Sequence, residues 1–494
     1  MCGIAGFAGN FNEEEGTAVW KMIQTLKHRG PDDVAAWIAP GIALGHSRLS
    51  ILDLSSSGKQ PMRSASGRYV VVFNGEIYNH RDVREELGSF RWRGHSDTET
   101  LLAAIEAFGL EAALSRLAGM FAFALWDCHE RQLILARDRV GEKPLYYGWI
   151  NDVFAFGSEL KALRAHPDWS GCIDRDALTS YMRFGYVPTP KSIFQGVQKL
   201  LPGNFLVFPW ETRPGTELPT QHYWSALSTA LQSSAILPAE RAEDELEFLL
   251  HRVVGRQMLS DVPVGAFLSG GIDSSTIVAL MQKQSSSPVR TFCIGFEDGQ
   301  YDEAHHAKAI AEHLGTKHTE LYATSGDALS LIPRMSEIFD EPFGDSSAIP
   351  TFLVAELARQ QVTVALSGDG GDELFGGYNR YLWGQSIWKV GGHLPIAIRR
   401  ALGRGLTKLP ADAWDILFSP ARALLPKRLG YKAIGDKVHK LASIIDFESA
   451  SDLYRSLISL HREPNELVIG GSELRSWAEF ESLRFKKNDF YAIF

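Results

Sequence analysis

A cysteine stands directly after the initiator methionine, in the run Met1-Cys2-Gly3-Ile4. Removal of the methionine makes Cys2 the N-terminal residue, so that its thiol lies beside a free α-amine. The pKa of an ordinary cysteine is about 8.5 and that of an α-amine about 7.7–8.0, which lets the amine take the thiol proton near neutrality. The residue type and its position therefore predict an activated nucleophile.

Two glycine-rich loops in the second half follow apolar runs. The loop at 269–275 (SGGIDSS) follows the run 264–268, and the loop at 367–373 (SGDGGDE) follows the run 362–366. Backbone N–H groups at such strand-to-helix turns bind anions, and glycines let the backbone approach phosphate closely. No GK[ST] is present, so a P-loop is not predicted. The structural alternative is an ordinary turn in which Ser274 caps a helix.

Acidic residues accompany both loops. Asp273 lies in the first, and Asp369, Asp372 and Glu373 lie in the second. Carboxylates beside a phosphate site would repel a nucleotide unless a divalent metal bridges them, which implies Mg²⁺. The structural alternative for Asp372 and Glu373 is a role at a helix N-terminus.

Composition limits the class of partner. The chain has 494 residues, of which 45% are apolar and 22% charged, as in globular proteins. Its net charge of −9 argues against nucleic acid or an anionic membrane, so small metabolites are the expected partners. No apolar run reaches the ~18 residues of a membrane span and no secretion signal is evident, which predicts a cytoplasmic protein. The four cysteines form no CxxC pair, so a structural zinc site is not expected.

Apolar periodicity divides the chain into two halves. Residues 1–208 predict an α+β domain built on antiparallel sheets, and the proline-punctuated stretch 209–238 is the expected linker. In residues 239–494 strand and helix patterns alternate, which predicts a parallel sheet whose ligands bind beyond the carboxyl ends of its strands. The β-patterned runs lie at 69–73, 120–125, 131–136, 264–268, 291–294 and 362–366, and helical patterns of the first half lie at 81–87 and 97–108.

These residues and their order resemble the glutamine-hydrolysing asparagine synthetases of the class II amidotransferase type, from Met1 to about residue 380. The matching segments are MCGIAGF from Met1, HRGPD from His28, RLSILD from Arg48, FNGEIYN from Phe73, SDTE from Ser96, ARDRVGEKPLYY from Ala136, SGGIDSS from Ser269, FDEP from Phe339 and SGDGGDELFGGY from Ser367. The resemblance implies an N-terminal-nucleophile amidotransferase sandwich over 1–208. It also implies an α/β parallel-sheet synthetase domain of the ATP-pyrophosphatase type over 239–494.

In the glutaminase half the resemblance assigns a role to each motif residue. Cys2 would attack the side-chain amide of glutamine, giving a thioester and ammonia, and Asn74 with the backbone N–H of Gly75 would form the oxyanion hole. Taken alone, Asn74-Gly75 would favour a hairpin turn, and Arg48 a surface ion pair. The implied glutamine-binding residues are Arg48 for the α-carboxylate, Glu76 and Asp97 for the α-ammonium, and Leu49, Ile51, Asn74 and Gly75.

In the synthetase half the resemblance implies that ATP activates the β-carboxylate of aspartate as an acyl-adenylate. Asp369 matches a catalytic carboxylate that assists this step and deprotonates ammonia, and Asp273 with Asp372 are the expected metal ligands. Ammonia would cross between the domains through a dry passage. The implied ATP-binding residues are Leu268, Ser269, Gly270, Gly271, Asp273, Ser274, Ser275, Ile294, Ser367 and Gly368.

The C-terminal part departs from the family pattern. The K-x-D-x-x-x-M and L-E-x-R-x-P-x-L-D segments of the family do not occur before Phe494, and residues 485–494 resemble none of the family's endings, so the chain looks truncated. Two alternatives stay open: an acceptor other than aspartate, such as a cell-surface sugar acid, and a glutaminase-only remnant. A lactam-forming enzyme is disfavoured because those relatives usually lack the nucleophile that Cys2 provides. The family favours a homodimer formed through the N-terminal domain.

Overall fold

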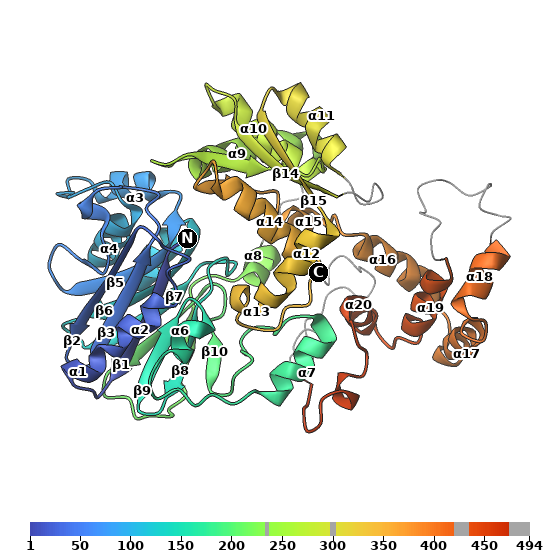
Figure 1. Cartoon of the computed structure of the whole chain (residues 1–494), viewed down its shortest axis with the longest axis horizontal. Coiled ribbons are helices and arrows are strands. Elements are labelled where there is room, and N and C mark those ends of the chain that lie inside the picture. Colours follow the sequence, from blue (N-terminus) through green and yellow to red (C-terminus); the bar gives the residue numbers. More distant parts are fainter. Residues whose placement is uncertain (233–236, 297–302, 419–433, 474–494) are drawn as a thin grey trace. The chain divides into compact units, whose positions relative to one another are not determined.

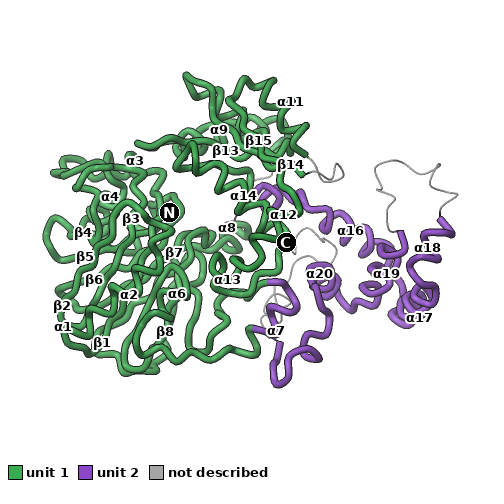
Figure 2. The backbone as a smooth tube through the Cα atoms, in the orientation of Figure 1, with its two compact units in different colours: residues 1–177, 186–369 green, residues 178–185, 370–494 purple. Residues whose placement is uncertain are grey.

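The computed structural model describes residues 1–232, 237–296, 303–418 and 434–473 (Figure 1). The chain divides into two compact units (Figure 2). Unit 1 holds residues 1–177 and 186–369, and unit 2 holds residues 178–185 together with the chain from 370 onward. The sheets of both predicted halves belong to unit 1.

The first part of unit 1 contains two six-stranded antiparallel sheets. The strands of the first sheet are β1 (Gly3–Gly9), β2 (Asp33–Ala39), β3 (Ile42–Arg48), β8 (Tyr146–Ile150), β9 (Val153–Gly157) and β10 (Val197–Lys199). Those of the second are β4 (Met62–Arg63), β5 (Tyr69–Ile77), β6 (Gly119–Asp127), β7 (Gln132–Arg137), β11 (Asn204–Pro209) and β12 (Thr220–His222). Their orders are β10-β8-β9-β1-β3-β2 and β12-β11-β7-β6-β5-β4.

The two sheets pack face to face, and helices cover the outer face of each. Strand β5 shows the layering, because alternate residues of a strand point to opposite faces. Val70 and Val72 lie in the core between the sheets, whereas Val71 and Phe73 lie in the core formed with the covering helices. The helices are α1 (Glu13–Gly16), α2 (Ala18–Gln24) and α6 (Leu160–Arg164) on the first sheet, and α3 (His80–Leu87), α4 (Asp97–Phe108) and α5 (Leu110–Arg116) on the second. This arrangement confirms the predicted N-terminal-nucleophile sandwich.

The stretch predicted as a linker contributes to the second sheet. Strand β12 pairs with β11 in antiparallel register from Asn204 opposite His222 to Leu206 opposite Thr220. Helix α8 (Ala226–Gln232) follows, and α9 (Ala239–Gln257) opens the next part of the chain. The domain boundaries at 208 and 239 stay a prediction.

The second part of unit 1 is built on a parallel sheet. Its strands are β13 (Val264–Phe267), β14 (Arg290–Phe296), β15 (Lys317–Ala323) and β16 (Val364–Leu366), in the order β15-β14-β13-β16. Its further helices are α10 (Ile272–Gln284), α11 (Ala304–Leu314), α12 (Ser325–Leu331), α13 (Met335–Ile338) and α14 (Ala348–Arg359). One core packs α9, α10 and α11 against β13, and another packs α14 against Phe292 of β14. Helices on both faces of a parallel sheet confirm the predicted α/β domain.

The described residues of unit 2 are helical. Its elements are the end of α7 (Arg175–Phe184), α15 (Gly371–Phe375), α16 (Asn379–Gly391), α17 (Ile396–Leu406), α18 (Ala411–Phe418), α19 (Ile434–Ile444) and α20 (Ala450–Ile458). Arg183 of α7 donates to Ser459 Oγ at 3.1 Å and forms an ion pair with Glu473. This contact holds the segment 178–185 to the last described part of the chain. Residues 485–494, on which part of the predicted departure from the family rests, lie outside the described residues.

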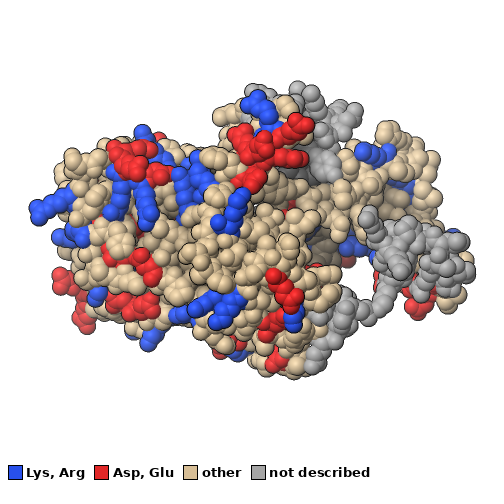
Figure 3. Space-filling view, turned by 90° about the horizontal axis from the view of Figure 1, so that it is seen from above, with Lys and Arg blue, Asp and Glu red and all other residues tan. Residues whose placement is uncertain are grey.

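The length and apolar content of the helices and the distribution of surface charge concern the expected partners. Among the described helices, none is long and apolar enough to cross a membrane. On the face drawn in Figure 3, basic and acidic side chains are interspersed. Small-molecule partners, a cytoplasmic location and a homodimer stay predictions.

Candidate active site

Cys2 lies just before β1 and opposite the end of β3. The strands pair with Gly3 opposite Ser47, so the chain that continues beyond β3 passes the thiol. The N–H of Leu49 donates to Sγ of Cys2 at 3.4 Å, and the thiol donates to the carbonyl of Leu49 at 3.6 Å. The carbonyl of Cys2 accepts a hydrogen bond from Nε of Arg29 at 2.9 Å. Two of the predicted site residues, Cys2 and Leu49, are therefore in direct contact.

The ionisation of the Cys2 thiol depends on whether Met1 is still present. With Met1 in place, burial raises the pKa of the Cys2 thiol, and the charge of the N-terminal amine works in the opposite direction. Burial also lowers the pKa of the Met1 amine to about 6, which leaves that amine neutral at pH 7. A thiol with a raised pKa is mostly protonated and a weak nucleophile. Removal of Met1 places the free amine on Cys2 itself, the arrangement that the sequence predicts for activation.

Asn74 of β5 is fully buried, and its amide lacks a partner. Neither Nδ2 nor Oδ1 makes a hydrogen bond to any residue that the structure describes. An unsatisfied buried polar group costs about 1–3 kcal/mol, so a position with only a structural role would favour an apolar side chain. A ligand that supplies the missing partner accounts for the amide, as the predicted oxyanion role requires.

Gly75 presents its N–H at an unpaired edge of β5. The N–H groups of Phe73 and Ile77 donate to the side chains of Gln60 at 2.6 Å and Asp97 at 2.8 Å, on the edge that faces away from β6. Alternate residues of an antiparallel strand direct their N–H groups to the same edge, so Gly75 points there too. Strand β4 pairs with β5 only near the start of β5, and in the described chain no strand reaches Gly75 on this edge.

The packing of β5 against β6 requires glycine at position 75. Asn74 and Gly75 lie inside β5 and not in the hairpin turn that their dipeptide alone would favour. A Cβ on Gly75 would lie 2.3 Å from the carbonyl oxygen of Met120 on β6. The close approach of the two strands therefore excludes any side chain here.

Glu76, which is half-buried, and Asp97, which is buried, form an acidic pair beside this edge. Burial and the neighbouring charge of Asp97 raise the pKa of Glu76 well above its ordinary value. Burial raises the pKa of Asp97 to about 6, although its carboxylate accepts the N–H groups of Ile77 and Thr98, each at 2.8 Å. A cation between two such acids would relieve their repulsion and restore their ionisation. The α-ammonium of an amino acid is a cation of this kind.

Arg48 ends β3 and is buried, not paired on the surface. Its Nη1 donates to the carbonyl of Ser55 at 3.1 Å and its Nη2 to the carbonyl of Asp53 at 2.5 Å. A guanidinium carries five N–H donors in one plane, so these two bonds fix its orientation and leave donors for a carboxylate. Ile51, another predicted glutamine-binding residue, lies on the same turn.

The two glycine-rich loops leave neighbouring parallel strands and touch. Strands β13 and β16 pair with Ala266 opposite Leu366, so both loops begin at the same edge of the sheet. A Cβ on Gly368 would lie 2.6 Å from the backbone nitrogen of Ser274. The structure thus brings together the predicted residues 269–275 with Ser367 and Gly368.

The first loop ends at the N-terminus of α10. Gly271 is the N-cap residue and no side chain caps the helix, so its first N–H groups are open to an anion. Gly270 has a φ of 82°, and a Cβ there would lie 2.8 Å from Cβ of His306. The N–H of Ser269 donates to Oγ of Ser274 at 3.2 Å and closes the loop. This geometry suits a pyrophosphate group.

The remaining predicted nucleotide residues flank the same strand ends. Leu268 is buried, and its N–H donates at 2.9 Å to the carbonyl of Phe292, two residues before Ile294 on β14. Asp369 is exposed and accepts a hydrogen bond from Oγ of Ser367 at 3.0 Å. The side chains expected at adenosine and at the reacting group therefore lie at one edge of the sheet.

The predicted metal ligands fall in different units. Asp273 stands in the first turn of α10, and Asp372 belongs to α15 of unit 2. Within the described ranges no group of three or more His, Cys, Asp and Glu side chains could hold a metal by itself. A site that combines Asp273 with Asp372 stays a prediction.

A chain of charged contacts, not singled out from the sequence, joins the nucleophile to the synthetase half. Arg29, which holds the carbonyl of Cys2, pairs with Glu159 at 2.6 Å, and Glu159 pairs with Lys161 at 2.6 Å. The backbone N–H of Lys161 donates to Asp340 at 2.7 Å. Burial opposes ionisation of Glu159, but its cationic partners lower its pKa to about 2. No local pattern marks Glu159 or Lys161, because their partners are distant in sequence.

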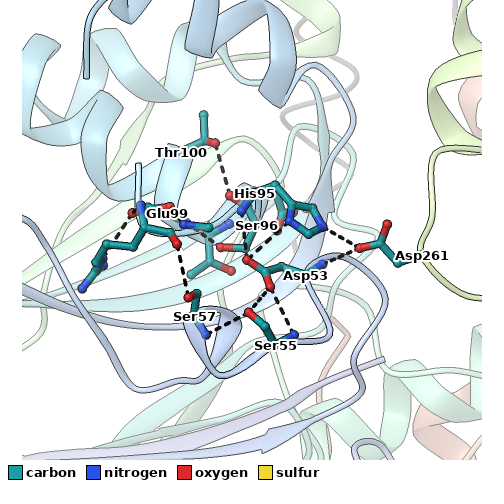
Figure 4. Close-up of polar contacts among 12 residues, drawn as sticks. Asp53, Ser55, Ser57, His95, Ser96, Glu99, Thr100 and Asp261 are labelled. Atoms are coloured by element: carbon teal, nitrogen blue, oxygen red, sulfur yellow. Dashed lines mark hydrogen bonds and ion pairs between the residues drawn. The ribbon is translucent and has the colours of Figure 1, made fainter. Parts of the chain in front are cut away.

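A second set of contacts between the halves surrounds Asp53 (Figure 4). Asp53 is 1% exposed and lies on the turn after β3, and Asp261 lies just before β13. Asp261 accepts hydrogen bonds from Asp53 and His95. Asp53 is the last residue of the matching segment RLSILD, which carries no assigned role for it, and His95 and Asp261 lie in none of the matching segments.

Fold and site together define a class: an N-terminal-nucleophile glutamine amidotransferase joined to an ATP-dependent synthetase. Family models agree with this division. The model described as "Glutamine amidotransferase domain" matches residues 1–224, and the model described as "Asparagine synthase" matches residues 245–488.

Relatives narrow the class to a family. The putative asparagine synthetase [glutamine-hydrolyzing] 2 of Methanocaldococcus jannaschii is 39% identical over 405 residues, which are 78% of this chain and 77% of the relative. Asparagine synthetase [glutamine-hydrolyzing] 1 of Bacillus subtilis is 39% identical over 388 residues, 76% of this chain and 59% of the relative. The putative asparagine synthetase [glutamine-hydrolyzing] of Mycobacterium bovis is 36% identical over 432 residues, 83% of this chain and 65% of the relative. The chain belongs to the family of glutamine-hydrolysing asparagine synthetases, which are carbon–nitrogen ligases.

The match does not cover the whole length of every relative. The matched region spans less than two thirds of the Bacillus and Mycobacterium relatives. Among solved structures, the glutamine phosphoribosylpyrophosphate amidotransferase of B. subtilis aligns over 65% of each chain with a TM-score of 0.34 and 18% identity, and it adds nothing to the assignment.

Proposed function

We propose that the chain forms asparagine from aspartate, takes the nitrogen from glutamine and cleaves ATP to AMP and pyrophosphate. Its family joins these two activities, and the asparagine synthase family uses ATP. One observation carries the proposal: a single chain holds a buried, unpartnered amide in the sandwich that bears Cys2, and two touching glycine-rich loops on a parallel sheet.

The glutaminase half would work through an N-terminal thiolate. After removal of Met1, the α-amine of Cys2 takes the thiol proton, and the sulfur attacks the side-chain carbonyl carbon of glutamine. Asn74 Nδ2 and the N–H of Gly75 stabilise the oxyanion that forms. The ammonium group of Cys2 returns its proton to the departing nitrogen, ammonia leaves, and water hydrolyses the thioester to glutamate.

The synthetase half would bind ATP at the edge where the two loops meet. The N-terminus of α10 takes up the phosphates, and Leu268 with Ile294 contacts the adenosine. The β-carboxylate of aspartate attacks the α-phosphorus, and pyrophosphate leaves. Ammonia then attacks the activated carbonyl, Asp369 takes a proton from the nitrogen, and AMP is released.

Mg²⁺ fits this site as a partner of the nucleotide. Magnesium is commonly held by one or two carboxylates together with substrate phosphates, so a protein cage of three ligands is not needed. Asp273 in the first turn of α10 is the proposed ligand within unit 1, and the role expected of Asp372 stays a prediction. Bound there, the ion would neutralise charge on the phosphates.

A cavity within unit 1 supports transfer of ammonia between the halves. It has a volume of about 390 Å³, and its lining includes Arg29 and Tyr146 from the glutaminase half and Asp340 and Glu341 from the synthetase half. Arg29 also donates to the carbonyl of Cys2, so one residue of the cavity wall contacts the nucleophile residue. We propose that ammonia passes along this wall.

Asparagine formation from aspartate and MgATP tests the proposal, with glutamine or free ammonia as the nitrogen source. We expect the parent chain to use both sources and Cys2→Ala to use ammonia alone. Glutamine hydrolysis without asparagine from either source would contradict the proposed acceptor. Loss of the ammonia-dependent reaction in Cys2→Ala would contradict the separation of the two sites.

A further inference from the structure

The turn that follows Arg48 has a fixed shape. Asp53 adopts a φ of 56°, a left-handed conformation that is unfavourable for a residue with a side chain. Its carboxylate accepts hydrogen bonds from the N–H and hydroxyl of Ser55, at 3.2 and 2.5 Å, and from the N–H of His95 at 2.9 Å. The carbonyls of Asp53 and Ser55 are the two acceptors that orient the guanidinium of Arg48. The conformation of this turn therefore sets the direction of Arg48.

Asp261 holds the same turn from the synthetase half. Its N–H donates to the carbonyl of Ile51 at 3.0 Å, and its Oδ2 accepts the N–H of Asp53 at 2.8 Å. Asp261 therefore contacts the backbone on both sides of Leu52. A displaced Asp261 would leave a buried backbone N–H of the turn without an acceptor, so the turn follows its position.

The segment that carries Asp97, the residue expected to bind the α-ammonium of glutamine, contacts the same carboxylate. Nε2 of His95 lies 2.7 Å from Oδ2 of Asp261, and Figure 4 shows both groups directed at each other. His95 directly precedes Ser96, the N-cap residue of α4, and Asp97 is the first residue of that helix. One oxygen atom of Asp261 thus contacts the turn that orients Arg48 and the segment that carries Asp97.

Asp261 is ionised when it makes these contacts. The hydrogen bond from His95 is the main cause that lowers the pKa of Asp261. Burial opposes ionisation of Asp53, but the hydrogen bonds from Ser55 and His95 lower its pKa overall. Both carboxylates therefore act as acceptors at neutral pH, and hydrogen bonds to ionised acceptors are stronger than those between neutral groups.

We propose that Asp261, a residue of the synthetase half, is a positioning residue for glutamine in the other half. It fixes the turn that aims Arg48 at the α-carboxylate and holds the segment that begins at His95. The proposal rests on the proposed function, because it assumes that Arg48 binds glutamine. It predicts that the glutaminase half binds glutamine with full affinity only when β13, the strand that follows Asp261 and leads to the first glycine-rich loop, is in place.

Glutamine hydrolysis by Asp261→Asn and Asp261→Ala tests this role in the full chain. We expect the KM for glutamine to rise about fivefold to tenfold in both variants, with kcat changed less than about twofold, since a binding contact shared by ground and transition states is lost. Ammonia-dependent asparagine synthesis should keep its parent rate, because Asp261 touches neither loop of the nucleotide site. The α-carboxamide of glutamine, used as a competitive ligand, should lose less affinity in the variants than glutamine does, since it lacks the carboxylate that Arg48 receives and keeps only the α-ammonium contact on the Asp97 side.

Asp82→Asn is the matched control. Asp82 of α3 forms an ion pair with Arg256 of α9, which also joins the two halves but does not touch the turn after Arg48. We expect its KM for glutamine to stay within about twofold of the parent. An unchanged KM in both Asp261 variants, or an equal loss of glutamine-dependent and ammonia-dependent activity, would overturn the proposal. A parent chain that hydrolyses no glutamine would instead refute the proposed function, and the role of Asp261 with it.

Discussion

The thiol of Cys2 and the backbone of Leu49 contact each other in both directions. The N–H of Leu49 donates to the sulfur at 3.4 Å, and the thiol donates to the carbonyl of the same residue at 3.6 Å. Only the first of these bonds survives when the thiol loses its proton, and a hydrogen bond to the charged form favours that form. Leu49 can therefore hold the sulfur in place both before and after proton transfer to the α-amine.

An extra residue before Cys2 should abolish glutamine hydrolysis. Inserting a lysine between Met1 and Cys2 moves the α-amine away from the thiol, whose pKa burial already raises in the unprocessed chain. A lost general base costs about 100-fold or more, so glutamine hydrolysis should fall by at least that factor. Intact mass would establish the N-terminus, and ammonia-dependent synthesis is the control that should not change. Full glutaminase activity in a chain that retains the insertion would contradict the role of the α-amine.

Asn74→Ala should lower kcat and leave stability nearly unchanged. Removal of one oxyanion donor costs about 100-fold to 1,000-fold in kcat, whereas the KM for glutamine should change less than about threefold. Because the amide of Asn74 has no partner in the described structure, its loss breaks no hydrogen bond there. The cavity that the lost amide leaves offsets the relief of its unsatisfied polar atoms, so we expect thermal unfolding to shift little, although Asn74 is fully buried.

Asn204→Ala is the control for this prediction. Asn204 is equally buried in the same sandwich, but its Nδ2 donates to the carbonyl of Pro202 at 2.7 Å. Its loss should therefore lower the free energy of unfolding by about 1 kcal/mol and leave kcat unchanged. If Asn74→Ala kept its kcat, or if both variants lost stability equally, the oxyanion assignment would be wrong.

Glu76→Gln should stabilise the fold and weaken glutamine binding. Burial and Asp97 raise the pKa of Glu76 above its ordinary value of 4.5, so its ionised form is unfavourable in the folded chain. Removing that charge should raise the free energy of unfolding by about 0.5–2 kcal/mol at neutral pH, while the KM for glutamine rises about tenfold through loss of an ammonium contact.

The pH dependence of stability provides a separate measurement on Glu76. Between pH 4.5 and its raised pKa, the folded chain keeps a proton that the unfolded chain has released. The free energy of unfolding should therefore fall as pH rises through that interval, and the slope should be smaller in Glu76→Gln. Glu14→Gln, on exposed α1, is the matched control and should leave the slope unchanged. An identical slope in Glu76→Gln and parent would contradict the proposed repulsion.

Local pattern predicted the elements and the resemblance implied most of the site residues, but neither shows how distant segments meet. The run 69–73 lies within β5, and the run 131–136 overlaps β7 in all but its first residue, because alternation of apolar side chains is a local property. The hydrogen bond from Asp53 to Asp261 joins residues 208 positions apart. Neither residue differs in type from an ordinary loop aspartate, so only the tertiary fold shows that they meet.

The same limit applies to the stretch expected as a linker. Its prolines predict a break in structure, yet Thr220 to His222 complete the second sheet as β12, since a short edge strand needs few residues and tolerates nearby prolines. Asn74-Gly75 likewise carries a hairpin signal but lies inside a strand. In both cases pairing with a neighbouring strand overrides local preference.

Gly368→Ala should abolish ATP-dependent chemistry and leave glutamine hydrolysis intact. A Cβ there would lie 2.6 Å from the backbone nitrogen of Ser274 and 2.9 Å from the carbonyl carbon of Asp273. Both are backbone atoms of the first turn of α10, so they cannot move aside as a flexible side chain would. The two loops must separate, and the N–H groups expected to bind the phosphates lose their position.

Aspartate-dependent exchange between ATP and pyrophosphate measures this effect directly, and we expect a loss of at least about 100-fold, the cost of a displacement of about 1 Å. Gly326→Ala in α12 is the matched control, because a Cβ there would meet only Oγ1 of Thr324 at an ordinary 3.4 Å. It should exchange at the parent rate and unfold at the same or a slightly higher temperature, since alanine favours helix over glycine. Normal exchange in Gly368→Ala would show that the contact between the two loops does not form the nucleotide site. Loss of glutamine hydrolysis in the same variant would show that the damage reaches the sandwich, where neither loop lies.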